Sequence, residues 1–389
     1  MIKRNATQTI LRLCQGFPVV AVTGPRQSGK TTLARAVFPD KPYVSLEDPD
    51  VRTFADDDPR SFLARYPDGA ILDEVQRCPE LFSYLQGVVD ADGRMGLFLL
   101  TGSQQFGLFS NITQSLAGRV GMVQLLPFGY GELHRADRAP AEVETAIFMG
   151  SYPPLYDRPV TPADWYLAYV ATYVERDLHQ LIQVRDLKAF QLFLRMCAAR
   201  TGQLLNLSAL ANDCGIAHNT AKAWLSVLEA SYIIFFLQPH YRNFGKRLTK
   251  SLKLYFYDTG LVSWLLGIRS PEQITIHALR GALFETWVVA ELMKGRFHRG
   301  LASNLYFWRD STGNEVDVLA EQGERLFPIE IKAGRTLASD AFAGLNRWCE
   351  LAGEFAGSAH LCYAGNEDRR RGGVSVLPWR EVAFLSETL

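Results

Sequence analysis

Residues 24 to 31 read GPRQSGKT and have the composition and spacing of a phosphate-binding loop. The motif G-x-x-x-x-G-K-[ST] is complete, and it lies between the apolar run PVVAVTG and a segment rich in helix-forming residues. Amide groups at the N-terminus of a helix bind anions, so we expect this loop to hold the phosphates of a nucleotide. The alternative is a glycine-rich turn that carries a lysine by chance. The predicted contacts are Gly24, Pro25, Arg26, Gln27, Ser28, Gly29, Lys30, Thr31 and Thr32.

Four side chains in and near this loop have the chemistry of nucleotide hydrolysis. Lys30 is expected to contact the β- and γ-phosphates, and Thr31 to ligate Mg²⁺. A second apolar run, AILDEVQ, ends on Asp73 and Glu74, and such acids are costly to bury unless they face a site. Asp73 suits a Mg²⁺ ligand in the nucleotide site, and Glu74 suits the base that polarises an attacking water. The alternative for both acids is a solvated strand end.

A third apolar run, FLLTGSQQ, ends on the polar residues Ser103 and Gln104. In a parallel sheet this end of a strand points at the ligand crevice. Ser103 and Gln104 would there contact the nucleotide, position the water or sense the γ-phosphate. An ordinary strand-to-helix turn explains the same residues equally well.

A second group of charged residues lies in NEVDVLAEQGERLFPIEIKAG, where two strand-like stretches are joined by a polar turn. Asp317 lies on the first stretch, while Glu330 and Lys332 lie on the second, two residues apart and therefore on one face of the strand. Buried strands rarely carry this much charge without a function. We expect Asp317 to come within metal-ligand reach of Glu330 on the neighbouring strand. The alternative is a solvated strand end that carries a short charged motif.

The elements that position these residues follow from the pattern of apolar runs. In residues 17–135 continuous apolar runs alternate with helical segments, which predicts a parallel sheet covered on both faces. The predicted strands are PVVAVTG, YVSLED, GAILDE, GLFLLTG and VGMVQLLPF. Residues 136–200 are expected to be helical. The last segment is expected to contain a helix (280–294), strands (305–309, 315–320 and 326–332), a helix (339–351), a strand (358–363) and a further strand in GVSVLPW.

Several runs of the sequence resemble the prokaryotic AAA+ ATPases that carry a C-terminal domain of unknown function. The first half contributes LDEVQ, LTGSQQ and SLAGRVGMVQLLPFGYGEL, and the second half contributes KRLTKSLKLYFYDTGLVSWLLG and GALFETWVVAEL. AAA+ ATPases complete their site with an arginine, often from a neighbouring subunit, that stabilises charge in the transition state. The resemblance makes Arg119 that catalytic arginine and implies a homo-oligomer. The alternative is a structural arginine that is paired with a carboxylate.

Residues 201–274 have a different pattern: a helix, a turn at Gly215, a second helix capped by Asn219 or Thr220, and two strands joined by a basic loop. This order resembles a winged helix, which implies that the second helix enters the major groove of DNA. The second helix is mostly apolar, so its packing inside the protein is the alternative. The basic residues predicted to contact DNA phosphates are Arg242, Lys246, Arg247, Lys250 and Lys253.

The closing segment, with its helix–three strands–helix–strand order, resembles the PD-(D/E)XK nuclease fold in its Holliday-junction-resolvase-like form. The resemblance implies that Asp317 and Glu330 hold one or two Mg²⁺ or Mn²⁺ ions, with Glu285 completing the metal site from the first helix. Lys332 would orient the attacking water or stabilise the developing charge. Asp317, Glu330 and Lys332 are therefore the catalytic residues implied for this domain. The alternative is a fold that has lost catalysis and binds only.

Composition limits the classes of function. The 41 basic and 41 acidic residues balance, so contact with nucleic acid would require a local patch. The six cysteines form no C-x-x-C pair and are expected to be reduced. The N-terminal MIKRNATQTILRL lacks a secretory apolar region, and no apolar run reaches membrane-spanning length. These features predict a cytoplasmic protein with no membrane partner.

The sequence thus predicts an α/β protein with four parts. They are an AAA+ P-loop ATPase core with a parallel sheet (1–135), a helical lid or linker (136–200), a winged-helix-like segment (201–274) and a PD-(D/E)XK nuclease-like α/β domain (275–389). The first hypothesis is an ATP-hydrolysing, Mg²⁺-dependent protein that processes DNA with a metal-dependent nuclease. The second is a nucleotide-controlled switch or DNA-binding ATPase with a catalytically silent nuclease fold, and the third is a protein-remodelling ATPase. ATP and Mg²⁺ are the expected cofactors, with Mn²⁺ as an alternative at the nuclease-like site.

Overall fold

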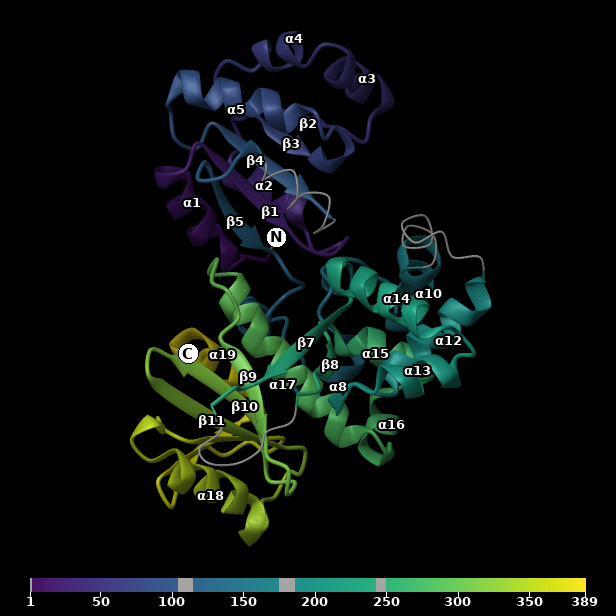
Figure 1. Ribbon diagram of the computed structural model, residues 1–389, viewed down its shortest axis with the longest axis vertical. Coiled ribbons are helices and arrows are strands. Elements are labelled where there is room, and N and C mark those ends of the chain that lie inside the picture. Colours follow the sequence, from purple (N-terminus) through teal and green to yellow (C-terminus); the bar gives the residue numbers. More distant parts are fainter. Residues whose placement is uncertain (1, 104–114, 175–185, 243–249) are drawn as a thin grey trace. The chain divides into compact units, whose positions relative to one another are not determined.

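The computed structural model describes residues 2–103, 115–174, 186–242 and 250–389 (Figure 1). The chain divides into two compact units. The first contains Met1–Phe128, Ala230–Tyr232 and Phe297–Leu301, and the second contains Gly129–Glu229, Ile233–Arg296 and Ala302–Leu389. Among the described residues, no helix has both the length and the apolar character that crossing a membrane requires.

The first unit is built on a five-stranded parallel sheet, as the continuous apolar runs predicted. The order is β2 (Tyr43–Ser45), β3 (Ile71–Asp73), β4 (Phe98–Gly102), β1 (Val19–Thr23) and β5 (Val120–Gln124). Strands β1, β3 and β4 are buried along their whole length, which explains why their sequences are uniformly apolar rather than alternating.

Helices cover both faces of this sheet, and alternate residues of β1 define the two layers. Val20 and Val22 pack in an apolar cluster with residues of the first two helices, including Ile10 and Leu33. Val19 and its neighbours on the opposite face pack in a second cluster with residues of the later helices. The helices of this unit are α1 (Ala6–Gly16), α2 (Lys30–Val37), α3 (Pro49–Asp57), α4 (Pro59–Ala64) and α5 (Leu81–Asp92), with the 3₁₀ turn η1 (Val75–Arg77) after β3.

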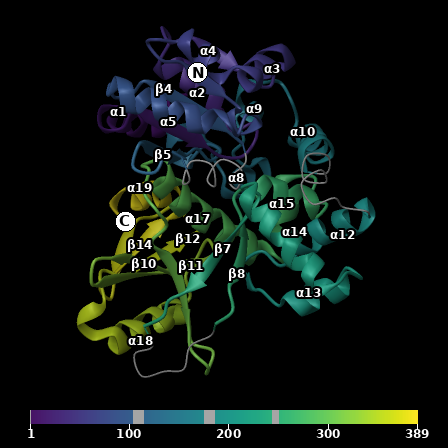
Figure 2. The ribbon, with the colours of Figure 1, turned by 45° about the horizontal axis from the view of Figure 1, so that its top comes forward.

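The second unit contains a nine-stranded mixed sheet. Its order is β13 (Arg369–Arg371), β14 (Val374–Pro378), β12 (His360–Tyr363), β11 (Arg325–Lys332), β10 (Glu315–Gln322), β9 (Leu305–Arg309), β7 (Ile234–Pro239), β8 (Lys253–Phe256) and β6 (Gln203–Leu204). Strand β7 pairs in parallel with β9, and the amide of His240 continues this contact by donating to the carbonyl of Phe307 at 2.7 Å. The strands of the predicted middle and closing segments therefore form one sheet (Figure 2).

The helices of the second unit lie mainly in the predicted helical segments. They are α7 (Tyr130–Arg135), α8 (Val143–Met149), α9 (Pro154–Asp157), α10 (Pro162–Tyr169), the π-helical turn η2 (Val170–Val174), α12 (Leu187–Ala198), α13 (Leu207–Asp213), α14 (His218–Ala230), α15 (Thr259–Leu265), α16 (Pro271–Ile276), α17 (Arg280–Phe297), α18 (Ala343–Ala352) and α19 (Val382–Thr388). Short 3₁₀ turns are η3 (Ser339–Phe342), η4 (Gly353–Phe355) and η5 (Trp379–Glu381). Because α14 begins at His218, Asn219 and Thr220 lie within its first turn and do not cap it as predicted.

A buried carboxylate, Asp258, holds three elements of the second unit together. Its side chain caps α15 by accepting from the amide of Leu261 at 2.9 Å. It also accepts from the amide of Ser151 at 2.7 Å and from the hydroxyl of Tyr166 at 2.6 Å. The residue is 3% exposed, so these donors satisfy a charge that would otherwise be costly to bury.

We therefore expect Asp258→Ala to lower the free energy of unfolding by about 3 kcal/mol, because the buried donors of Ser151 and Tyr166 lose a charged acceptor. Asp213→Ala is the control: Asp213 pairs with Arg200 on the surface, and its loss should cost less than about 1 kcal/mol. Urea denaturation of both variants measures the difference. Equal destabilisation by the two substitutions would contradict the role of Asp258.

Candidate functional site

The loop between β1 and α2 has the backbone conformation that its glycines allow. Gly24 has a φ of 147°, and a Cβ at this position would lie 2.1 Å from the carbonyl oxygen of Leu125, so no larger residue fits. Gly29 precedes α2 with a φ of 91° and lies in the left-handed region, as Gln27 does with a φ of 66°. Arg4 fixes the loop from outside by donating to the carbonyl of Ser28 at 2.8 Å.

Lys30 is buried at the start of α2 and its side chain turns back into the loop. Its Nζ atom donates to the carbonyl oxygens of Gly24 at 3.0 Å and Pro25 at 2.9 Å. Burial lowers the pKa of Lys30 to about 8, although the nearby carboxylates of Glu74 and Asp73 oppose this shift. A phosphate anion in the loop would favour the charged ammonium, so Lys30 suits the role of a phosphate contact.

Asp73, the last residue of β3, accepts hydrogen bonds from hydroxyl groups on three other elements. Thr31 Oγ1 donates to both carboxylate oxygens at 3.1 and 3.0 Å, and the Tyr43 hydroxyl donates at 2.7 Å. Thr101 Oγ1, on β4, donates to Oδ1. A hydroxyl and a carboxylate are oxygen ligands of the kind that Mg²⁺ prefers, so Thr31 and Asp73 fit a magnesium ion at this point. Sequence reasoning missed Tyr43 and Thr101.

Glu74 follows Asp73 in a left-handed conformation, with a φ of 55°. Such a conformation is unfavourable for a residue other than glycine and recurs at functional sites. Ser103 Oγ donates to Glu74 Oε2 at 3.1 Å, and Gln76 Nε2 donates to the same oxygen. The structure therefore brings Ser103 and Glu74 together at the carboxyl ends of β4 and β3. Gln104 lies outside the described residues, and no sequence signal identified Gln76.

The other polar residues in and around the loop differ in their burial and contacts. The guanidinium of Arg26 lies 3.7 Å from the carboxylate of Glu47, which also contacts Arg77 at 3.3 Å. Thr32 is exposed on α2, whereas Ser28 is fully buried. The Thr23 hydroxyl, directly before the loop, shares a 2.8 Å hydrogen bond with the buried hydroxyl of Tyr232. This last contact joins positions more than two hundred residues apart, and sequence reasoning missed it.

Arg119 lies in an ion pair with Asp90 of α5. Its Nη2 donates to Asp90 Oδ2 at 2.9 Å and its Nε donates to Oδ1, so the pair is bidentate. A third donor, Nη1, bonds the carbonyl of Ala117 at 3.1 Å. Arg119 is thus paired with a carboxylate of its own chain, as expected for an arginine with a structural role. Its action in the site of a neighbouring subunit stays a prediction.

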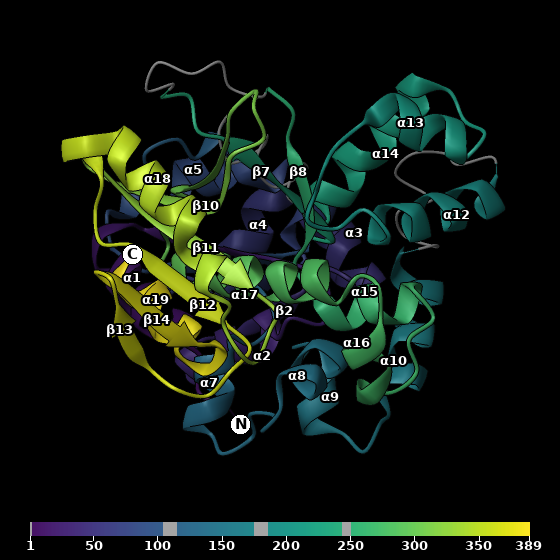
Figure 3. The same ribbon diagram turned by 90° about the horizontal axis from the view of Figure 1, so that it is seen from below.

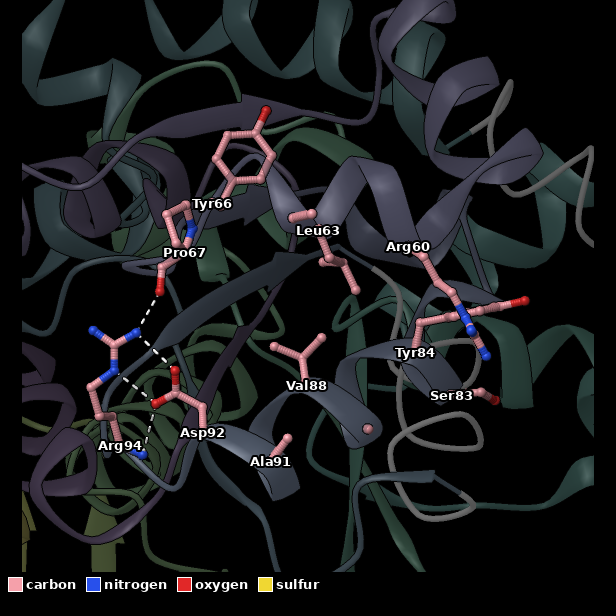
Figure 4. A pocket seen from close by; sticks show the side chains of 12 residues that line it. Arg60, Leu63, Tyr66, Pro67, Ser83, Tyr84, Val88, Ala91, Asp92 and Arg94 are labelled. Atoms are coloured by element: carbon pink, nitrogen blue, oxygen red, sulfur yellow. Dashed lines mark hydrogen bonds and ion pairs between the residues drawn. The ribbon is translucent and has the colours of Figure 1, made fainter.

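A separate groove of about 940 Å³ lies between α4 and α5 (Figure 4). Leu63 and Val88 contribute apolar side chains, and the guanidinium of Arg60 lies 5.9 Å from the ring centre of Tyr84. Its lining includes no residue of the phosphate-binding loop and neither Asp73 nor Glu74. We therefore assign the nucleotide chemistry to the loop and not to this groove.

In the second unit, the charged residues predicted for a nuclease-like site lie close together. The register places Val318 opposite Ile329, so Asp317 lies beside Glu330, and Asp317 Oδ2 accepts from the amide of Ile331 at 2.8 Å. Lys332 Nζ lies 2.5 Å from Glu330 Oε1. Burial raises the pKa of Asp317 well above its usual value, and the carboxylates of Glu285 and Glu330 raise it further.

An unexpected residue, Lys253 of β8, joins this cluster. Its Nζ lies 3.0 Å from Glu285 Oε1 and 2.5 Å from Glu315 Oε1, and its side chain is 4% exposed. Tyr255, also on β8, donates its hydroxyl to the same oxygen of Glu285. Within the described residues, no group of three or more His, Cys, Asp and Glu side chains has the arrangement of a metal site. The cluster as it stands therefore does not fit the metal that the nuclease resemblance implies.

The predicted DNA contacts divide into three groups. Lys253 was predicted as a surface phosphate contact, and this is wrong because the residue is buried among carboxylates. Lys246 and Arg247 lie outside the described residues. Lys250 is exposed, and Arg242 lies 4.1 Å from the ring centre of Phe355.

The second helix of the middle segment, α14, packs inside the protein with its apolar face. Helices α12 and α14 belong to the same part of the second unit (Figure 3). Trp224 of α14 contacts Phe190 and Phe193 of α12, each at 5.2 Å between ring centres. Ala221, Leu225 and Leu228 are buried on the same helix. The apolar residues therefore serve packing, and a docking of this helix in DNA stays a prediction.

Three family models match the chain. An AAA domain matches residues 16–134, a domain of unknown function (DUF8612) matches 140–272, and a domain of unknown function (DUF4143) matches 280–382. The first match contains the phosphate-binding loop and the acids that end β3. The chain therefore carries a P-loop ATPase domain of the AAA type.

Relatives with a similar sequence define the family more closely. The chain is 33% identical over 340 residues to uncharacterized protein Rv2008c of Mycobacterium tuberculosis and to uncharacterized protein Mb2031c of Mycobacterium bovis. The match covers 86% of this chain and 74% of each relative. The chain belongs to the family of these two mycobacterial proteins.

Solved structures overlap with the fold more loosely. The Walker-type ATPase PABY2304 of Pyrococcus abyssi overlaps with 68% of this chain and 96% of its own length, at a TM-score of 0.44 and 15% identity. The RuvB Holliday junction branch migration motor of Thermotoga maritima overlaps with 59% of this chain and 88% of its own, at a TM-score of 0.30 and 18% identity.

The ion pair between Arg119 and Asp90 makes it possible to test whether Arg119 is catalytic or structural. If Arg119 stabilises transition-state charge in a neighbouring subunit, Arg119→Ala should keep ATP binding and lower turnover by about a hundredfold or more. Asp90→Ala removes the same ion pair and is the matched control, because it leaves the arginine free to act. Steady-state ATP turnover over a range of protein concentrations measures both variants. Equal turnover in the two variants would show that Arg119 is structural only.

Proposed function

We propose that this protein is a Mg²⁺-dependent ATPase whose hydrolytic site consists of the phosphate-binding loop, Asp73 and Glu74. The observation that supports the proposal most strongly is the hydrogen bond between Thr31 and Asp73, beside the buried Lys30. Motif and geometry agree here, since the phosphate-binding cation and one ligand oxygen come from adjacent residues at the start of α2, and the other ligand oxygens come from the end of β3.

Each side chain has a distinct role in this proposal. Lys30 neutralises charge on the phosphates, and Thr31 and Asp73 supply oxygens for the metal that accompanies the nucleotide. Ser103 and Gln76 both donate to Glu74 Oε2, and among the described residues Oε1 remains to accept a proton from the attacking water. ATP supplies a γ-phosphoryl group whose transfer to water releases phosphate. The left-handed backbone of Glu74 turns its carboxylate away from the strand direction and toward Ser103 at the same sheet edge.

For the second unit, the sequence left open whether the closing domain cleaves DNA or has lost catalysis and only binds. The position of Lys253 favours a domain without catalysis. The proposed cleavage site would use Glu285, Asp317 and Glu330 as metal ligands, with Lys332 beside them. An ammonium already lies against Glu285, so the geometry supports an ATPase with a catalytically silent closing domain better than a nuclease. DNA association through Lys250 and Arg242, assembly into an oligomer and location in the cytoplasm stay predictions.

Two substitutions test the ATPase proposal. Glu74→Gln keeps the shape of the side chain and removes the base, so it should bind ATP normally and hydrolyse it at least about a hundredfold more slowly. Lys30→Ala removes a phosphate contact and should weaken binding. The control is Glu80→Gln, the same chemical change at an exposed position at the start of α5. Calorimetry with ATP and Mg²⁺, followed by a phosphate-release assay, measures both steps.

The proposal would be wrong if the wild-type protein bound no nucleotide under any Mg²⁺ concentration tested. It would also be wrong in its assignment of the base if Glu74→Gln and Glu80→Gln released phosphate at the same rate.

A further inference from the structure

The acidic cluster of the second unit contains a buried ammonium group that comes from a different part of the chain. Glu285 lies on α17, whereas Glu315 and Asp317 lie on β10. Lys253 lies on β8. In the sheet, β9 and β7 lie between β10 and β8. The Lys253 side chain crosses over Phe307 of β9, with Nζ 5.5 Å from the ring centre, and so reaches the carboxylates.

The contacts of Lys253 are those of a structural cation. Its ammonium donates to one oxygen of Glu285 at 3.0 Å and to one oxygen of Glu315 at 2.5 Å. Burial lowers the pKa of Lys253, but the carboxylates of Glu285, Asp317 and Glu315 outweigh burial and raise the pKa above its usual value. The lysine therefore stays charged wherever the carboxylates around it are ionised.

Two carboxylates of the cluster also have cation partners other than Lys253. Lys332 lies 2.5 Å from Glu330 Oε1, and Arg309 Nη1 lies 3.1 Å from Glu315 Oε2. Four carboxylates thus face three cations, counting Lys253. Removing Lys253 would leave carboxylates that repel one another, because Glu285 and Glu330 both act electrostatically on Asp317, and Glu285 also acts on Glu330.

We propose that Lys253 is a built-in cation that replaces a divalent metal in this cluster, so that the folded domain needs no metal and binds none there. One of the two oxygens of Glu285, Oε1, already contacts both Lys253 and Tyr255. Glu330 is held on its other side by Lys332 through Oε1, while its buried Oε2 has no partner among the described residues. This proposal does not depend on the ATPase activity of the first unit.

The test uses Lys253→Met, which keeps a long, unbranched side chain to pack on Phe307 but removes the charge. Without divalent metal, this variant of the full chain should unfold at a lower temperature than the wild type. Millimolar Mn²⁺ should recover part of that stability, and calorimetry should show a Mn²⁺-binding event that the wild type lacks, since an opposing charge is gone. Adding Asp317→Asn to Lys253→Met should abolish the gain.

Asp317→Asn in the wild-type background is the matched control, since any Mn²⁺ bound at the nucleotide site is common to all four proteins. The proposal predicts that the wild type and Asp317→Asn respond identically to Mn²⁺ in calorimetry and thermal unfolding. A wild-type Mn²⁺ response that Asp317→Asn removes would overturn the proposal, and so would a Lys253→Met variant that is as stable as the wild type and indifferent to Mn²⁺.

If the Lys253→Met variant fails to fold, the double variant Lys253→Met with Glu285→Gln still tests the proposal. The second substitution removes the carboxylate that has lost its partner, so the double variant should recover folding. If Lys253→Met and the double variant were equally unstable, the lysine would contribute packing rather than charge, and the proposal would fall.

Discussion

The hydrogen bonds to Asp73 are the interaction on which the nucleotide site depends. One carboxylate at the end of β3 receives hydroxyls from α2, β2 and β4, through Thr31, Tyr43 and Thr101. These three donors exist together only if β2, β3 and β4 are neighbours in a parallel sheet whose carboxyl ends meet at one edge, and this is the observed order. The order of the strands therefore determines which hydroxyl groups can reach Asp73.

Each unit contains a buried lysine, and the surroundings of the two lysines shift their pKa values in opposite directions. Lys30 is bound by carbonyl oxygens, and burial lowers its pKa, so an incoming anion improves its environment. Lys253 is bound by carboxylates, which raise its pKa, and its charge is already compensated. The same side chain therefore suits ligand binding in the first unit and structural compensation in the second.

The sequence predicted what local patterns encode and missed what long-range packing decides. All five strands of the first sheet lie within predicted runs, and β1, β3 and β4 are continuously apolar because they are buried along their whole length. The loop motif located Lys30 and Thr31. Tyr43 and Thr101 carry no motif, since their role comes from strand adjacency. Lys253 was predicted on the surface because it lies in a basic run, yet the pairing of β7 with β9 places β8 in the same sheet as the acidic strands, within reach of a long side chain. Such pairing between distant strands leaves no periodic signal in either one.

The central claim is that Thr31 and Asp73 hold the metal of a bound nucleotide. Calorimetric titration with ATP, with and without Mg²⁺, on the wild type and Asp73→Asn tests it most directly. The account predicts that Mg²⁺ tightens ATP binding to the wild type and has little effect on Asp73→Asn, because the substitution removes the carboxylate charge and leaves Lys30 in place. The same dependence on Mg²⁺ in both proteins, or no ATP binding to the wild type, would contradict the account.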